Sequence, residues 1–200
     1  MKKHFKQQVE TITTAYEKLE STAYNDFLND CLKTIRGGNA IIATALGKNV
    51  PICEKFVGTL NSLGIDAHFM HTNSAVHGDL GMIHDDDLVV VLSKSGETAE
   101  TLTLCELLTH RKTTNWLLTC NPESRSHEKI SSQIVLEVAQ EGDPWNLVPN
   151  NSTLVFMVFL QAVCMEIIDQ LPVKLETFKR NHPGGNIGAI LKAESPRGED

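Results

Sequence analysis

The sequence has no hydrophobic run as long as the roughly 20 residues that a membrane-spanning helix requires. Its longest apolar stretch covers residues 154–163, and the lysine-containing N-terminus has no apolar signal segment. Internal repeats, low-complexity segments and signs of a second domain are also missing from the 200 residues. These absences predict a single cytoplasmic domain with no membrane anchor.

Positive charge and paired cysteines are also scarce. Lys and Arg number 18 against 25 Asp and Glu, a formal net charge of -7, so we expect neither nucleic acid nor an anionic membrane as the main partner. A small anionic ligand is still compatible, because a local site can be positive on an acidic protein. The five cysteines are widely spaced and form no C-x-x-C pair. They predict reduced core thiols rather than disulfides or a zinc site.

Three common functional motifs do not occur. The sequence lacks the G-x-x-x-x-G-K-[ST] nucleotide loop and the G-x-G-x-x-G dinucleotide turn. It also lacks the G-x-S-x-G nucleophile elbow, which makes a Ser-His-Asp hydrolase a poor candidate.

What the chain does contain is an alternation of strand and helix patterns. A helical arm is predicted over residues 1–36, with a second helix around 25–35 that ends at Gly37 and Gly38. A long apolar helix, expected to be buried on most of its surface, is predicted at 152–171. Short apolar runs predict strands at 40–46, 65–70, 89–92, 115–120 and 134–138. We therefore expect an α/β fold, a three-layer, doubly wound parallel sheet of five strands, over residues 37–192 with a flexible tail at 193–200.

One turn of this fold is suited to a phosphate group. Ser93, Ser95, Gly96 and Thr98 follow the third predicted strand and precede a helical pattern. Such a turn offers hydroxyls, backbone N–H groups and the positive end of a helix. Simple capping of the helix by Ser95 or Thr98 would explain the same residues without a ligand.

Three charged residues follow strands and should share the carboxyl edge of the sheet with this turn. Lys48, beside Gly47, begins a helix, where the dipole disfavours a cation unless it meets an anion or a substrate oxygen. Glu100 lies in the first turn of the helix after the phosphate turn, where dipole stabilisation alone would account for it. Glu141 lies in a turn after the fifth strand. It is either a solvated loop acid or, in a closed site, an acid whose raised pKa suits proton transfer.

His182 precedes Pro183, Gly184 and Gly185, which fix its backbone and stop a helix. It is a candidate proton-transfer group, or a loop histidine with no task. The histidines between residues 68 and 84 match no metal-ligand spacing. We therefore expect no metal and no cofactor.

Together these residues resemble a known family. The motifs are G-K at Gly47, H-G-D-L-G-M from His77, S-x-S-G-E-x-x-E from Ser93, E-x-x-P from Glu141 and H-P-G-G from His182. In this order, from about residue 40 to 191, they are similar to the sugar isomerase (SIS) domain and, within it, to the D-arabinose-5-phosphate isomerases.

The resemblance implies a flavodoxin-like sheet, a homotetramer, and interconversion of D-ribulose 5-phosphate and D-arabinose 5-phosphate through a cis-enediol. It assigns catalysis to Lys48, Glu100, Glu141 and His182, with the histidine coming from a neighbouring subunit. It assigns ligand binding to Gly47, His77, Ser93, Ser95, Gly96 and Thr98. Within this set we expect Glu141 to be the carbon base, His182 to move oxygen protons and Lys48 to steady negative charge, while Glu100 orients or shares these transfers.

The chain departs from the family pattern at residues 45–50, 140–144 and 149–153, and it lacks the CBS modules that many members carry. Two alternatives therefore stay open. One is a non-catalytic regulator that binds a sugar phosphate, although no DNA-binding helical module is visible. The other is an isomerase of a different phosphosugar, such as a hexulose 6-phosphate.

Overall fold

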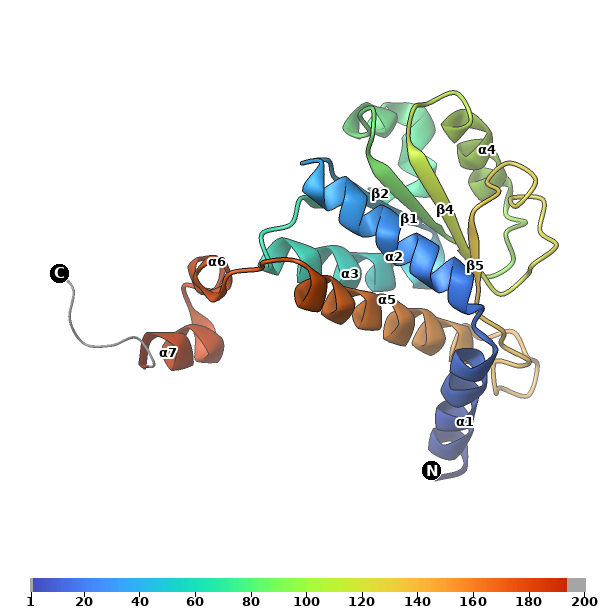
Figure 1. The fold of residues 1–200 in the computed structure, drawn as a ribbon. Helices are drawn as coiled ribbons and strands as arrows, with labels where there is room; N and C mark the ends of the chain where they lie inside the picture. Colours follow the sequence, from blue (N-terminus) through green and yellow to red (C-terminus); the bar gives the residue numbers. More distant parts are fainter. Residues whose placement is uncertain (1, 194–200) are drawn as a thin grey trace.

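The structure, a computed structural model, describes residues 2–193, and its centre is a twisted parallel sheet with helices on both faces (Figure 1). The strands are β1 Ile41–Ala45, β2 Ala67–His71, β3 Leu88–Leu92, β4 Thr114–Thr119 and β5 Gln133–Val135. All pairs are parallel, in the order β2-β1-β3-β4-β5. The predicted doubly wound sheet of five strands is confirmed.

The α-helices among the described residues are α1 Lys2–Lys18, α2 Ser21–Arg36, α3 Val50–Ser62, α4 Ala99–Leu108, α5 Asn151–Gln170, α6 Leu175–Asn181 and α7 Gly185–Ala193. Short 3-10 helices follow two strands: η1 Gly47–Asn49 after β1, and η2 Thr72–His77 with η3 Asp79–Met82 after β2. Of the predicted tail at 193–200, only Ala193 is described, as the last residue of α7; residues 194–200 lie outside the described part of the chain.

The sheet has a core on each face because side chains alternate along a strand. In β3, Leu88, Val90 and Leu92 join the larger core with α2, α3 and α5, whereas Val89 and Val91 join the smaller core with α4. Burial on both faces explains why the strands read as unbroken apolar runs rather than as alternating patterns.

Two predicted boundaries were wrong for local reasons. Helix α2 begins at Ser21 rather than near residue 25, because the carboxylate of Glu20 accepts hydrogen bonds from the N–H groups of Thr22 and Ala23. Strand β5 ends at Val135 rather than at 138, because only the first residues of the predicted strand pair with β4. The last hydrogen bond between the two segments runs from Leu136 N to Thr119 O.

Helix α5 is less buried than the sequence predicts. Phe156, Leu160 and Val163 are buried in the larger core, but Val158 and Met165 are almost half exposed on the opposite side. It is also longer than the run at 154–163, and it is the one described helix whose length and apolar composition would allow a membrane crossing. The helix packs against α1, α2 and α3, so its apolar composition is that of a core helix.

Candidate active site

The register of the sheet brings the turns that follow its strands to one edge. Ala45 pairs with Leu92 and Leu92 with Leu118, while Thr119 pairs with Val135. The turns that begin after β1, β3, β4 and β5 therefore leave the sheet side by side, as the carboxyl ends of parallel strands do. The predicted phosphate turn, residues 93–98, lies between the turn of Lys48 and the turns of β4 and β5.

Two serine hydroxyls make hydrogen bonds within the phosphate turn. Ser93 Oγ accepts a hydrogen bond from Gly96 N at 3.1 Å, and Ser95 Oγ accepts one from Glu97 N at 3.2 Å. Thr98 is the N-cap residue of α4, but its side chain makes no capping hydrogen bond. The alternative in which Thr98 caps the helix therefore does not describe this structure, and the first N–H groups of α4 have no intrahelical acceptor.

The end of β4 and the segment after it bind the phosphate turn. Three successive carbonyl oxygens of the turn, those of Lys94, Ser95 and Gly96, accept hydrogen bonds from this part of the chain. The donors are Thr119 Oγ1 and Cys120 N at 3.1 and 3.0 Å, Asn121 Nδ2 at 3.1 Å and Ser126 Oγ at 2.6 Å. Contacts within the chain therefore define the backbone of the turn.

Glu141 is fully buried and caps the N-terminus of α5. Its Oε2 accepts hydrogen bonds from the N–H groups of Asn150 and Ser152 at 2.9 and 3.0 Å, and its Oε1 accepts one from Ser152 Oγ at 2.6 Å. The ammonium of Lys94 lies 2.6 Å from the same Oε1. This ion pair connects the carboxylate directly to the phosphate turn.

Neither alternative that the sequence left open for Glu141 holds, because the residue is not a solvated loop acid and its pKa is not raised. Burial does raise the pKa of this carboxyl, but the bonds from Lys94, from the Ser152 hydroxyl and from the two backbone N–H groups outweigh burial and leave the pKa below its ordinary value of 4.5. Glu141 is therefore ionised at neutral pH.

The other residues predicted at this edge are exposed. Lys48 lies in η1 after β1, His77 ends η2 after β2, and Glu100 lies in the first turn of α4. Among the described residues, the structure gives no hydrogen bond or ion pair to the side chains of Lys48 and Glu100. Both are therefore free to meet a ligand at the edge where they emerge.

His182 lies far from these groups within the same chain. Its Nδ1 is 2.8 Å from the carbonyl oxygen of Phe178, and the neighbouring Asn181 donates to the backbone of Asn61 and Ser62 at the end of α3. That end of α3 precedes β2 and so lies at the opposite edge of the sheet. Helix α5, whose N-terminus Glu141 caps, is 20 residues or roughly 30 Å long, and Figure 1 shows α6 and α7 beyond its far end.

Sequence reasoning missed the residues that hold Glu141. Lys94 could have been selected from the sequence, because it precedes a helix N-terminus, where the helix dipole disfavours a cation. The same argument selected Lys48. Asn150 and Ser152 were noticed only as a departure from the family pattern.

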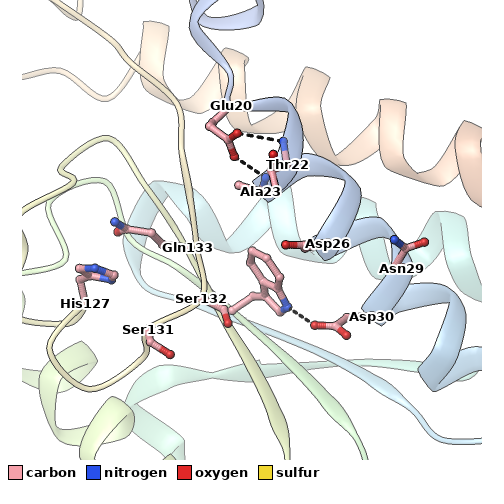
Figure 2. Close-up of a pocket in the computed structure, with 11 residues that line it drawn as sticks. Glu20, Thr22, Ala23, Asp26, Asn29, Asp30, His127, Ser131, Ser132 and Gln133 are labelled. Atoms are coloured by element: carbon pink, nitrogen blue, oxygen red, sulfur yellow. Dashed lines mark hydrogen bonds between the residues drawn. The ribbon is translucent and has the colours of Figure 1, made fainter.

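A cleft on another part of the molecule contains none of the predicted site residues. Figure 2 shows it between α2 and the segment that leads into β5. Its volume is about 540 Å³. Two of the carboxylates that line it have structural roles: Glu20 caps α2, and Asp30 accepts a hydrogen bond from Trp116 Nε1 at 2.9 Å. Within the described part of the chain, no group of three or more His, Cys, Asp or Glu side chains is arranged to hold a metal ion.

Known proteins share both the sequence pattern and the fold. Arabinose 5-phosphate isomerase KdsD of Pseudomonas aeruginosa is 35% identical over 182 residues, which cover 90% of this chain and 56% of that protein. The structure of Escherichia coli CFT073 c3406 in complex with arabinose 5-phosphate is 28% identical with a TM-score of 0.77, and the match covers 90% of this chain and 95% of that one. A solved structure from Listeria monocytogenes shares the fold at 24% identity, with a TM-score of 0.84 and 90% and 93% coverage.

The chain spans about half the length of the curated relatives it matches. The model of the SIS domain family matches residues 34–164, well over half of the chain and most of the sheet with its helices. On this match, and on the shared fold, the chain belongs to the SIS domain family.

Proposed function

We propose that this protein is an aldose–ketose isomerase of phosphorylated sugars, with D-arabinose 5-phosphate and D-ribulose 5-phosphate as its substrate pair. The observation that carries the proposal is the contact between Lys94 and Glu141, which holds a buried carboxylate against the turn where we place the phosphate. The names of the relatives and the sugar phosphate bound to c3406 support the same reaction and the same sugar.

In this proposal the phosphate binds the turn formed by Ser93, Ser95, Gly96 and Thr98. The N-terminus of α4 supplies N–H donors and a positive dipole end, which are the usual means of holding such an anion. Gly47 and His77 line the rest of the pocket. No metal or cofactor is needed for the proton transfers that follow.

Glu141 takes the proton from C2 of the open-chain aldose and returns it to C1, while one proton moves from the C2 hydroxyl to the C1 oxygen. The intermediate is a cis-enediol, and the product is the ketose. Lys48 steadies negative charge on the oxygens, and Glu100 orients the substrate.

We further propose that His182 moves the oxygen protons in the site of a second copy, within a homotetramer. The length of α5 supports this, because a chain's own His182 is too distant from its own Glu141. The ligand is a small sugar phosphate, and we propose a cytoplasmic location with no nucleic-acid or membrane partner.

The purified protein should be incubated with a panel of pentose and hexose phosphates, with aldose–ketose exchange followed by NMR. We expect conversion of arabinose 5-phosphate. Conversion of only a hexulose 6-phosphate would correct the substrate, and binding without any conversion would instead identify a sugar-phosphate sensor.

Glu141→Gln should lower turnover by about 10²–10⁴-fold, the usual contribution of one acid–base group, while sugar phosphate still binds. Glu137→Gln is the matched control, because Glu137 is a half-exposed acid four residues earlier that pairs with Lys18 at the surface. Thermal unfolding should confirm that both variants are folded. Full turnover in folded Glu141→Gln would remove Glu141 from the mechanism.

A further inference from the structure

The carboxylate of Glu141 has no free acceptor position in this structure. An ionised carboxylate offers about four lone-pair positions, and here four donors contact its two oxygens. They are Asn150 N, Ser152 N, Ser152 Oγ and Lys94 Nζ. A general base must accept a proton in hydrogen-bond contact with it, so one of these donors has to leave before Glu141 can act.

Lys94 is the donor that is free to move. The other three belong to the first turn of α5 and its N-cap residue, and helix α5 fixes them in place. The side chain of Lys94 is 41% exposed, whereas that of Glu141 is 0% exposed, so the lysine is the partner of this ion pair that solvent or a ligand can reach. Because the carbonyl oxygen of Lys94 is held by Thr119 and Cys120, its backbone stays fixed while its long side chain can turn.

An anion in the phosphate turn would attract this ammonium. Lys94 lies between Ser93 and Ser95, so a phosphoryl group bound by those residues is within reach of its side chain. A phosphate monoester carries a charge of about -1.5 to -2 at neutral pH, more than the single charge of the carboxylate. The Cys120 thiol adds no competing charge, because burial raises its pKa to about 12.

We propose that Lys94 exchanges partners on substrate binding: its ammonium leaves Oε1 of Glu141 for the phosphoryl group, and the freed Oε1 becomes the acceptor for the sugar's proton. Lys94 is then a substrate-binding and positioning residue. The base is held by its four donors in the free protein and released only when a phosphorylated ligand is present. This inference rests on the proposed isomerase function, and it explains how a saturated carboxylate can serve as its base.

A double-mutant cycle in phosphate binding tests the exchange without any turnover. Inorganic phosphate is titrated calorimetrically into the wild type, Lys94→Met, Glu141→Gln and the double variant. Lys94→Met should weaken binding by about tenfold, the loss of one charge-assisted contact. Glu141→Gln should tighten binding by about threefold or more, because Lys94 no longer has a carboxylate to leave, and in the Lys94→Met background this gain should vanish.

Three results would overturn the exchange: a wild type that does not bind phosphate, an unchanged affinity in Glu141→Gln, or a gain that persists without Lys94. If Glu141→Gln does not fold, the Nζ signal of Lys94 in the wild type, identified by its loss in Lys94→Arg, gives the answer by NMR. It should shift on saturation with phosphate, and an unmoved signal would contradict the exchange.

The catalytic consequence separates this inference from the proposed function. Lys94→Met should raise KM for arabinose 5-phosphate more than it lowers kcat, and Lys94→Arg should restore part of the loss. Coupled phosphate binding with no sugar conversion would overturn the isomerase and leave the ion-pair exchange standing. Sugar conversion without the coupling would overturn only the exchange.

Discussion

At the scale of single residues, Glu141 joins two parts of the molecule that are far apart in sequence. It satisfies two N–H groups at the start of α5, and it pairs with a lysine 47 positions earlier, in the phosphate turn. A carboxylate at a helix N-terminus is favourable for the helix dipole, and a fully buried one requires such partners. The position of the proposed base and the stability of α5 therefore depend on the same side chain.

The pH dependence of stability should show how much the charge of Glu141 stabilises the fold. The folded-state pKa of Glu141 is lowered, so its ionised form stabilises the fold at pH values above its ordinary value of 4.5. This contribution is lost as the pH falls below that value and through the lower folded pKa. The difference in urea midpoint between wild type and Glu141→Gln should therefore shrink when the pH is lowered from 7 to below 4.

Glu137→Gln provides the control for general acid effects, because its surface pair with Lys18 is worth little. A difference between wild type and Glu141→Gln that stays constant over this range would mean that Glu141 does not stabilise the fold through its charge.

The sequence was sufficient to place Glu141, Glu100 and Lys48 at one edge of the sheet, but not to describe what surrounds each side chain. Strand patterns put all three at the carboxyl edge of a parallel sheet, and the structure agrees. The direction of the Glu141 pKa could not be predicted, since it depends on Lys94, Asn150 and Ser152, whose approach only the folded chain determines. A buried acid without these partners would have the opposite shift.

At the scale of elements, the phosphate turn depends on a glycine. Gly96 has φ +63, and a Cβ at this position would lie 2.4 Å from the Ser124 hydroxyl oxygen. Its carbonyl oxygen accepts the hydrogen bond from Ser126 that ties the turn to the segment after β4. The S-x-S-G pattern therefore needs glycine for its backbone and for the close approach of this segment.

Gly96→Ala should destabilise the fold by more than the about 1–2 kcal/mol expected for a left-handed alanine, and it should weaken phosphate binding. Gly38→Ala is the matched control, because Gly38 has φ +76 with nothing within 4 Å of its Cβ position and lies outside the site. Denaturant unfolding and phosphate titration of both variants test this. Equal destabilisation, with phosphate affinity unchanged, would show that the contact with Ser124 does not constrain the turn.

Element boundaries were predicted less well than the elements themselves. The start of α2 was missed because Glu20, rather than one of the preferred short N-cap residues, caps the helix. The exposed side of α5 could not be predicted from a sequence that is apolar on nearly all sides, since the pattern does not say what covers each face.

At the scale of the whole molecule, the position of His182 means that the proposed site needs a second copy of the chain. Helices α6 and α7 extend away from the sheet at the end opposite the phosphate turn (Figure 1). The proposed site is complete only if this segment of one copy reaches the carboxyl edge of another. The sequence could suggest His182 through its motif, but its distance from Glu141 follows only from the path of the chain.

Mixing two inactive variants tests this arrangement. Glu141→Gln and His182→Ala should each lose most activity, and hybrids formed by co-refolding should regain up to about a quarter of the wild-type activity, because some sites then combine two unaltered residues. Light scattering should show that the oligomers are retained. Hybrids no more active than the two variants alone would contradict a site shared between copies.

The most direct measurement of the central claim is exchange of the sugar's carbon-bound protons with solvent. Arabinose 5-phosphate is incubated with the protein in D₂O, and the C2 position of the aldose and C1 of the ketose are followed by NMR. We predict ribulose 5-phosphate as the product, solvent deuterium on the exchanging carbon, and loss of both signals in Glu141→Gln. A protein that binds the sugar phosphate yet leaves it unconverted and undeuterated would contradict the account.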